Sequence, residues 1–321
     1  MGIGRDPRVK QALAKWAEVA PQIGQEAAAF RSRLIWQKDE PTRSHVVLRL
    51  TGPRRLILKA VFRAPADDPL HAAVSALRTA AERLKDHPKA HAPEVLYADD
   101  TLVVMTEATG KTLEAHLTAG RAHGPLLRRA GAWLAAFHGA SAMEDRTYQP
   151  KFMLRHAENM ARDVRAGKMS VAEPALFLAC CDALPARAVH DMRTLSSVRH
   201  GDFNMRNLLL GPDGETALDF KPSSSAPVGF DIIRLLMDYA ELHQPVADVP
   251  AGAVLSPATL QAFFRGYTLV DGHDPAVRFL PFVQLLNDWR LVPADTSKRS
   301  WRQAARMDTI AALAKNALAQ T

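Results

Sequence analysis

The sequence predicts an α+β fold in two parts. The smaller, N-terminal part has a five-stranded antiparallel sheet with one packed helix, and the larger, C-terminal part is mainly helical. Three observations lead to this prediction. A chain of 321 residues is too long for one simple hydrophobic core, which favours two domains or one large bilobal unit. Its composition, 47% apolar and 23% charged, is that of an ordinary folded protein. Its hydrophobic pattern changes from short alternating runs to helical spacing along the chain.

The sheet is predicted from short apolar runs that turn-forming residues separate. Lys38 to Pro41 and the pair Gly52-Pro53 break the first three runs, which favours an antiparallel meander. A helix start with an N-cap side chain, Asp68 before Pro69, precedes apolar residues at helical spacing. The expected strands are residues 33–36, 45–50, 56–62, 94–97 and 102–106.

After Gly110 the apolar residues follow helical spacing almost throughout, so we expect a domain boundary near this glycine. The expected domains are residues 1–108, with a helical extension over 1–30, and residues 109–321. The amphipathic extension either covers the small lobe or mediates association. One β-hairpin interrupts the helical part, because Gly211-Pro212-Asp213-Gly214 is turn chemistry between two apolar runs.

Composition and charge exclude several classes of protein. Cys180 and Cys181 are adjacent, which offers neither a disulfide framework nor metal-binding spacing. No stretch is apolar enough for a membrane span or a signal peptide, so we expect a cytoplasmic protein without a membrane partner. The net charge of +7 is scattered among acids and does not indicate nucleic acid. A basic run near the C-terminus is expected to be a solvated helix face: Lys298, Arg299, Arg302 and Arg306.

The most informative stretch begins at His200-Gly201-Asp202 and ends at Asp219. A hairpin turn centred on Asp213 would place Asn207 opposite Asp219. An amide oxygen and a carboxylate at that separation can share one hard cation such as Mg²⁺. Asp202, in the preceding loop, could accept a proton from a hydroxyl that attacks a metal-bound phosphate.

This order of residues resembles the catalytic core of the aminoglycoside phosphotransferase and choline kinase family, distant relatives of the protein kinases. The resemblance implies a bilobal protein-kinase-like fold with ATP and Mg²⁺ as cofactors. It implies that Asp202 is the catalytic base and that Asn207 and Asp219 bind the metal. It further implies that residues 1–108 form the nucleotide-binding lobe. In that lobe, Lys59 would contact the ATP phosphates, and the linker residues Glu107 and Ala108 would contact adenine. The alternative interpretation of Lys59 is an exposed residue on an edge strand.

Other segments resemble landmarks of the same family, and some residues depart from its pattern. The similar segments are residues 134–138, 227–231 and 264–267. Glu82 is expected to be solvated rather than paired with Lys59, because it lies far from the apolar axis of its helix. The loop 38–44 has no glycine, so Ser44 or Thr42 either contacts phosphate or serves only in the turn. Lys221 follows Asp219-Phe220 where amine-binding relatives carry an acid, which favours a neutral or anionic substrate; the alternative interpretation of Lys221 is a solvated loop residue.

Single histidine and aspartate residues have structural interpretations. His200 is expected to brace the catalytic loop, and His138 to be a satisfied core histidine. Asp231 precedes an apolar helix and is expected to cap it. Asp288 is a candidate for amine recognition, although it lies beside Trp289, which is expected to be buried.

The sequence therefore predicts an ATP- and Mg²⁺-dependent phosphotransferase that acts on the hydroxyl group of a small molecule. The alternative is a catalytically inactive nucleotide-binding module of the same fold. Phosphorylation of a protein side chain ranks last, because no recognisable activation segment follows Asp219.

Overall fold

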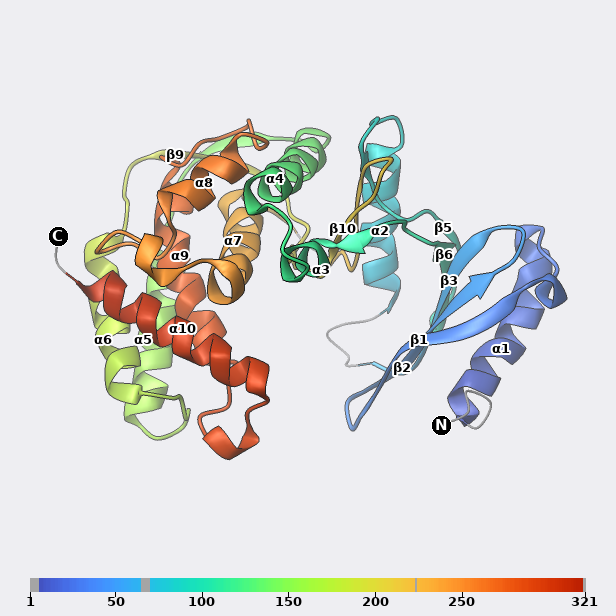
Figure 1. Ribbon diagram of the computed structural model, residues 1–321, viewed down its shortest axis with the longest axis horizontal. Coiled ribbons are helices and arrows are strands. Elements are labelled where there is room, and N and C mark those ends of the chain that lie inside the picture. Colours follow the sequence, from blue (N-terminus) through green and yellow to red (C-terminus); the bar gives the residue numbers. More distant parts are fainter. Residues whose placement is uncertain (1–5, 65–69, 223, 320–321) are drawn as a thin grey trace. The chain divides into compact units, whose positions relative to one another are not determined.

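The computed structural model describes residues 6–64, 70–222 and 224–319, and these residues form two compact units (Figure 1). The first unit comprises residues 1–111 and 209–223, and the second comprises residues 112–208 and 224–321. The division lies close to the expected boundary after residue 108. The hairpin segment differs from the prediction, because it packs with the first unit instead of the helical part.

The first unit contains the predicted five-stranded antiparallel sheet, in the order β1-β2-β3-β6-β5. Its strands are β1 (Arg31–Glu40), β2 (Arg43–Thr51), β3 (Arg55–Arg63), β5 (Val95–Ala98) and β6 (Leu102–Thr106). β1 extends through Lys38 and Glu40, so the first turn is shorter than expected and consists of Pro41 and Thr42. The mixed fold and the sheet predicted from the sequence are confirmed.

Helices cover both faces of this sheet, which corrects the expectation of a single packed helix. α1 (Pro7–Val19) buries Val9, Ala12 and Trp16 against apolar residues of β2 and β3. α2 (Leu70–Leu84) packs Leu70 and Val74 against the other face, where Val103 lies. The apolar stripe of the N-terminal extension thus completes the small core. The predicted start of α2 at Asp68 and Pro69 lies outside the described residues.

A second, small sheet in the order β4-β11-β10-β7 contains the hairpin. Its strands are β4 (Ala90–His91), β11 (Glu215–Ala217), β10 (Leu208–Leu210) and β7 (Lys111–Thr112). The Gly211 N–H donates to the Gly214 carbonyl at 2.8 Å, which makes a two-residue turn of Pro212 and Asp213. The expected register, centred on Asp213, is therefore wrong by one residue. Because the strands end at Leu208 and Ala217, Asn207 and Asp219 lie beyond the ladder.

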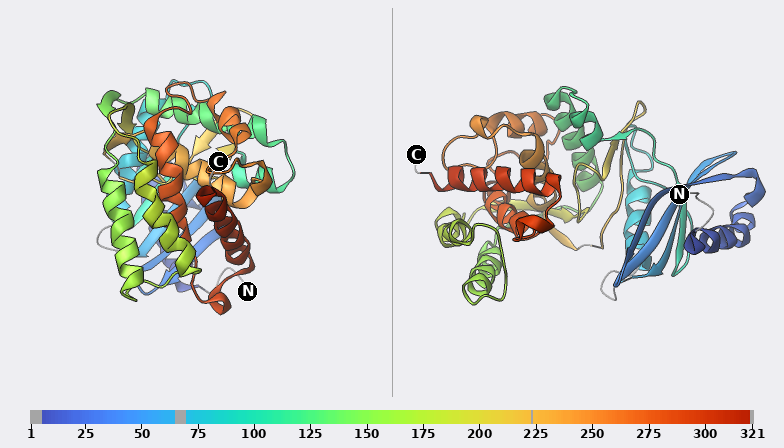
Figure 2. Two further views of the ribbon diagram at one scale, coloured as in Figure 1. Left: turned by 90° about the vertical axis from the view of Figure 1, so that its left-hand side faces the viewer. Right: turned by 60° about the horizontal axis from the view of Figure 1, so that its bottom comes forward.

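The second unit is mainly helical. Its helices are α3 (Leu113–Thr118), α4 (His123–Gly139), α5 (Lys151–Arg165), α6 (Pro174–Ala183), α7 (Gly229–His243), α8 (Pro257–Phe264), α9 (Pro275–Trp289) and α10 (Trp301–Leu318). α6 packs against both α5 and α10, and the three helices lie at one end of this unit (Figures 1 and 2). Short 3-10 helices connect elements of both units: η1 (Ala20–Ile23), η2 (Ala27–Ala29), η3 (Leu184–Arg187), η4 (Val246–Asp248) and η5 (Thr296–Lys298).

A three-stranded antiparallel sheet in the second unit was not predicted. It has the order β12-β9-β8, with β12 (Ser225–Pro227), β9 (Arg193–Val198) and β8 (Glu144–Thr147). β9 ends two residues before His200, so it positions the start of the loop that carries the His-Gly-Asp motif. The strands of this sheet therefore interrupt the helical part in addition to the predicted hairpin.

Two glycines set the close contact between α4 and the end of α8. A Cβ atom on Gly266 would lie 1.9 Å from the Arg128 carbonyl oxygen, and one on Gly131 would lie 2.4 Å from that of Phe263. These neighbours are backbone atoms of packed helices, so neither can yield without moving a helix.

We therefore expect Gly266→Ala to lower the free energy of unfolding by about 2 kcal/mol, as overpacking does in other cores. Urea denaturation measures this change. Gly124→Ala, in the first turn of α4 with no neighbouring atom within 4 Å of its Cβ position, is the control and should be nearly neutral. Equal stability of the Gly266 variant and the control would show that the helices do not pack as described.

Candidate functional site

The loop that carries the His-Gly-Asp motif is anchored by buried apolar residues. Phe203 and Met205 are fully buried. Phe203 stacks on Trp133 of α4 with ring centroids 5.3 Å apart. Asp202 lies between β9 and these two buried residues. Its side chain nevertheless remains 34% exposed. The loop is therefore fixed by its apolar residues while its acid stays accessible.

Two asparagines of the same loop hold the Asp202 carboxylate. The side-chain amide of Asn204 donates to Asp202 Oδ1 at 3.1 Å, and that of Asn207 donates to Oδ2 at 3.3 Å. Asn204 Oδ1 also accepts from the backbone N–H groups of Arg206 and Asn207, which closes the loop on itself. Since the contacts from Asn207 to Asp202 use its nitrogen, the amide oxygen is the atom with which Asn207 would bind a cation.

Asp231 of α7 clamps the start of the loop. Its carboxylate accepts from the backbone N–H groups of His200 at 2.6 Å and Gly201 at 3.1 Å, and from His138 Nε2 at 3.2 Å. Burial acts to raise the pKa of Asp231, but the hydrogen bond from His138, the charges of both histidines and the His200 N–H outweigh it and lower that pKa. Asp231 thus holds the loop and does not cap α7, contrary to the expectation.

The two histidines occupy the positions expected of structural residues. His138 is fully buried, and its Nδ1 lies 2.9 Å from the Tyr267 hydroxyl. His200 is also fully buried, and its Nδ1 accepts from the Asp202 backbone N–H at 3.3 Å. The His200 contact braces the backbone at Asp202, whereas His138 acts on the loop through Asp231.

Arg234, one turn after Asp231 on α7, links Asp202 to a second acid. Its Nε donates to Asp202 Oδ1 and its Nη1 to Asp288 Oδ1, both at 3.3 Å. The Arg234 side chain is 25% exposed and the Asp288 side chain only 3%. Asp288 is therefore already neutralised inside the protein, and its expected role in amine recognition is not supported by this arrangement.

A buried charged cluster lies behind the loop. Asp238 accepts from the Met205 backbone N–H at 3.2 Å and lies 3.4 Å from Arg306 Nη2. Glu241 is paired with the same guanidinium. Burial and then the neighbouring Asp288 raise the pKa of Glu241 well above its usual value, although Arg306 opposes this. The cluster connects α7 and α10 to the loop that carries Asp202.

The expectation that the C-terminal basic run is a solvated face holds for the exposed Lys298 and Arg302 but is wrong for Arg306. Arg306 is largely buried, and Arg302 pairs with Glu114. Arg299 donates to the carbonyl groups of Pro293 and Ala294. Helical spacing places Arg302 and Arg306 on one side of α10. Arg306 therefore connects α10 to the buried acids of α7.

In the first unit, Lys59 of β3 and Asp219, which follows β11, both act on the imidazole of His45 in β2. Lys59 pairs with Val47 of β2 and Val103 of β6, so β3 is a central strand and the edge-strand interpretation is wrong. Burial, followed by the charge of Lys59, lowers the pKa of His45, whereas the charge of Asp219 acts to raise it. Lys59 and Asp219 are thus close enough to His45 to act on the same group.

Asp219 has a backbone conformation that few residues with a side chain adopt. Its φ angle is 56°, in the left-handed region, and the residue is exposed while the following Phe220 is buried. Aspartate tolerates this conformation better than most residues, but it is uncommon and often marks a functional position. The turn of the chain exposes the Asp219 carboxylate.

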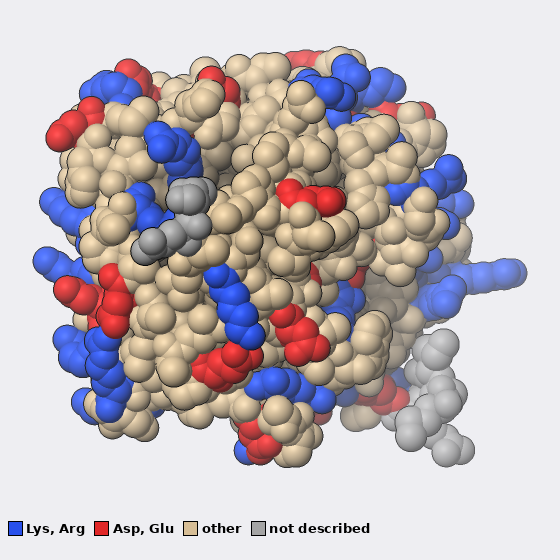
Figure 3. Space-filling model, turned by 60° about the vertical axis from the view of Figure 1, so that its left-hand side comes forward, with Lys and Arg blue, Asp and Glu red and all other residues tan. Residues whose placement is uncertain are grey.

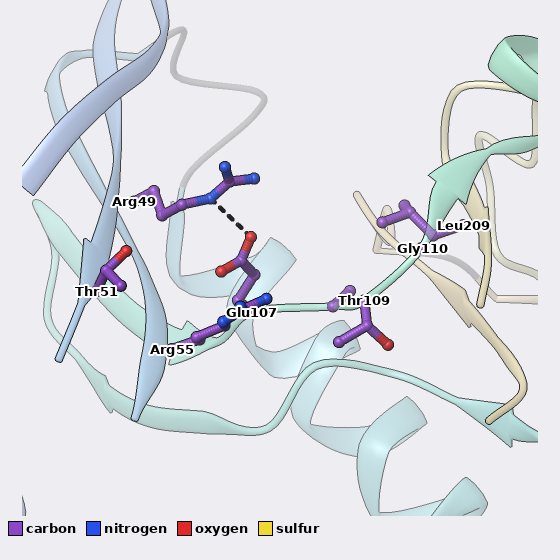
Figure 4. Close-up of a pocket in the computed structure, with 8 residues that line it drawn as sticks. Arg49, Thr51, Arg55, Glu107, Thr109, Gly110 and Leu209 are labelled. Carbon is purple, nitrogen blue, oxygen red and sulfur yellow. Dashed lines mark ion pairs between the residues drawn. The ribbon is translucent and has the colours of Figure 1, made fainter. Parts of the chain in front are cut away.

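The expected linker residues line a pocket of about 350 Å³ in the first unit (Figure 4). Glu107 and Ala108 share it with Arg49 and Thr51 of β2 and with Arg55 of β3. Arg49 Nε lies 2.7 Å from Glu107 Oε1. The pocket is therefore polar on the sheet side.

The structure gives outcomes for two departures from the family pattern, namely the position of Glu82 and the loop without glycine. Glu82 is exposed and pairs with Lys85, so it does not pair with Lys59, as expected. Ser44 is 2% exposed, and its hydroxyl accepts from Arg8 Nη1 at 3.3 Å. Because this hydroxyl is buried against α1, a phosphate contact through Ser44 is wrong, and the exposed Thr42 stays as the candidate.

The sequence analysis missed Arg234, His45 and Arg49. Arg234 lies in the apolar run Ile-Ile-Arg-Leu-Leu. A single cation in an otherwise apolar helix could have indicated a residue that pairs with an acid inside the protein. His45 and Arg49 alternate with the buried residues of β2, which places them on the face of the sheet that bears Lys59. Their partners are distant in sequence, so spacing alone did not reveal them.

Three further observations concern surface charge, hydropathy and possible metal ligands. Basic and acidic side chains intermingle on the face of the second unit turned toward the viewer in Figure 3. Within residues 6–64, 70–222 and 224–319, no helix is long and apolar enough to cross a membrane. In the same residues, no three His, Cys, Asp or Glu side chains cluster as metal ligands.

Comparisons with known proteins agree with this arrangement. Residues 39–280 match a family model described as the phosphotransferase enzyme family. A solved macrolide 2'-phosphotransferase from Brachybacterium faecium is similar, with a TM-score of 0.56, 17% identity, and coverage of 94% of this chain and 97% of that chain. No curated protein matches the sequence significantly.

Two further solved structures are similar at comparable levels. One is a choline/ethanolamine kinase family protein from Mesorhizobium loti, with a TM-score of 0.54, 16% identity, and coverage of 95% of this chain and 94% of that chain. The other is an amicoumacin kinase in complex with AMP-PNP and Ca²⁺, with a TM-score of 0.55, 16% identity, and coverage of 97% and 96%. These likenesses show the kinase-like fold.

Proposed function

Because the chain belongs to the phosphotransferase enzyme family, we propose that it transfers the γ-phosphate of ATP to a hydroxyl group of a small molecule, with Mg²⁺. The observation that supports this best is the Asp202 carboxylate, which is accessible yet held by Asn204, Asn207 and Arg234. A base that must meet an incoming hydroxyl needs this combination of access and fixed orientation.

In this proposal, Asp202 accepts the proton of the acceptor hydroxyl as that oxygen attacks the γ-phosphorus. Asp231, through the His200 and Gly201 N–H groups, keeps the loop in position. Lys59 binds the phosphates and offsets their charge. Most of the rate enhancement then comes from positioning and charge stabilisation, as in other phosphoryl transfers.

The residues present fit a magnesium ion. Asn207 offers an amide oxygen and Asp219 an exposed carboxylate, and both are hard oxygen donors. Mg²⁺ in nucleotide enzymes takes few protein ligands and completes its shell with phosphate oxygens and water. When bound, the ion would neutralise charge that develops on the phosphates. We propose that Asn207 and Asp219 hold it.

The acceptor is proposed to be a small molecule with a hydroxyl group, like the compounds named for the similar solved kinases. Arg234 lies beside the proposed base, but it is paired with both Asp202 and Asp288, so its charge is already compensated. The proposal of a neutral or anionic acceptor therefore rests on Lys221, which follows Asp219-Phe220.

The test is nucleotide consumption across a panel of hydroxyl-bearing metabolites and antibiotics, with Mg²⁺ and with a chelator. We expect turnover with at least one acceptor and its loss in the chelator. Nucleotide binding without turnover on any acceptor would favour the inactive module instead.

Removal of the Asp219 carboxylate tests the proposed metal site directly. We expect Asp219→Asn to raise the Mg²⁺ concentration for half-maximal rate by roughly tenfold or more, because it removes the one charged protein ligand. The measurement is initial rate against Mg²⁺ concentration. Asp213→Asn, at the exposed tip of the same hairpin, is the matched control and should leave the Mg²⁺ requirement unchanged. An unchanged requirement in both variants would remove Asp219 from the metal site.

A further inference from the structure

The pocket at the linker of the first unit carries more chemistry than a site for adenine needs. Its volume of about 350 Å³ is within the range of small-molecule sites. Its lining from β2 and β3 supplies two arginines, Arg49 and Arg55, and the linker supplies the carboxylate of Glu107. All of these residues belong to the first unit.

Glu107 is the unusual member of this pocket. Its side chain is only 10% exposed, and one carboxylate oxygen, Oε1, is paired with Arg49. The other oxygen, Oε2, is buried and has no hydrogen-bond partner within the described part of the chain. A buried carboxylate oxygen without a donor is costly, so the pocket lacks one hydrogen-bond donor that a ligand can supply.

The linker backbone leaves base recognition partly to side chains. The Glu107 N–H donates to the Arg55 carbonyl at 3.0 Å, and the Thr106 N–H donates to the Glu94 carbonyl at 3.0 Å. These two N–H groups continue the sheet and are not available to a base. These backbone donors are thus occupied, and the Glu107 carboxylate is a side-chain acceptor among the residues that line the pocket.

The arginines supply the complementary donors. Arg49 uses Nε for Glu107, and its terminal nitrogens are directed away from that carboxylate (Figure 4). The Arg49 side chain is 41% exposed, and Arg55 is exposed as well. A ligand in the pocket thus meets one acceptor group beside two guanidinium groups.

This pattern matches guanine better than adenine. Guanine has adjacent N1–H and N2–H donors on one edge and the acceptors O6 and N7 on another, and arginine is a common partner of O6 and N7. Adenine presents a lone pair at N1, which a carboxylate repels, and its usual partners are amides. We infer that this pocket binds the guanine base in preference to adenine, so that GTP is the preferred phosphate donor. The inference rests on the proposed nucleotide-dependent function and changes the donor expected from the family resemblance.

The guanine preference can be tested by measuring nucleotide binding, which needs no phosphate acceptor. Isothermal titration of the full chain with GDP, IDP and ADP, each with Mg²⁺, compares three bases. Hypoxanthine, the base of IDP, keeps N1–H and O6 but lacks the N2 amine. We expect GDP to bind most tightly, IDP less tightly, and ADP about tenfold or more weaker than GDP, as for other mismatched base contacts.

Glu107→Gln changes the acceptor carboxylate into an amide that can pair with adenine. We expect this variant to lose the GDP preference or reverse it. Glu94→Gln, the same substitution at an exposed residue of this unit, should keep the wild-type ratio. If the Glu107 variant does not fold, the wild-type series of three bases still decides.

The outcomes separate the two proposals. ADP binding as tight as or tighter than GDP would overturn the guanine inference and leave the phosphotransferase proposal intact. A GDP preference that persists in Glu107→Gln would remove the role of Glu107. Absence of binding by all three nucleotides would overturn the inference together with the proposed function.

Discussion

Replacement of Asp202 by asparagine is expected to lower kcat for phosphoryl transfer by about 10²- to 10⁴-fold, the usual contribution of a general base. Asparagine cannot accept the proton of the acceptor hydroxyl. It also places an amide where Asn207 donates to Oδ2, so two donors would face each other. The proposed nucleotide contacts of Lys59 and Glu107 are unaffected, and the nucleotide affinity should change little.

Steady-state kinetics with the best acceptor of the panel, together with a nucleotide titration, measures both quantities. Asp182→Asn is the matched control, since Asp182 is exposed and forms only a surface pair with Arg165. The control should retain wild-type kcat. If Asp202→Asn were as active as the control, Asp202 would not be the base.

The second large effect is expected at Asp231. Asp231→Asn should destabilise the second unit by about 3 kcal/mol, because a buried carboxylate with several donors is replaced by a group that cannot accept from all of them. The same change should lower kcat, since His200 and Gly201 lose their clamp, while KM for the nucleotide stays similar.

The stability difference between wild type and this variant should depend on pH. The folded-state pKa of Asp231 is lowered from the ordinary 3.8. Its contribution is therefore fully present above that value and is lost as the pH falls through the lower, folded-state pKa. Urea unfolding at neutral and acidic pH tests this, with Asp182→Asn as control. A difference that grows as the pH falls would contradict the assignment of an ionised, hydrogen-bonded Asp231.

Much of the first unit was predictable from local chemistry. The alternation of buried residues along β2 and the turn at Gly52-Pro53 predicted the meander, because a half-buried strand requires that period. The contribution of α1 remained open, since an amphipathic stretch does not reveal what its apolar face covers. The hairpin register failed because one hydrogen bond, between Gly211 and Gly214, decides it.

The His-Gly-Asp loop proposed to be catalytic was recognisable in sequence, but the residues that support it were not. Asp231 and Arg234 act on residues about thirty positions earlier, and such contacts depend on how α7 packs. β9 was missed because Arg-Thr-Leu-Ser-Ser-Val has no clear alternation. Local patterns therefore indicated the reacting groups, whereas the residues that hold them in place needed tertiary structure.

The central claim is that this chain moves a phosphoryl group from a nucleotide to a small-molecule hydroxyl. The most direct measurement follows a radioactive γ-phosphate, on ATP and on GTP, into each acceptor of the panel with wild type and Asp202→Asn. We predict labelled acceptor with the wild type and almost none with the variant. Label that stays on a tightly bound nucleotide with every acceptor would contradict the claim.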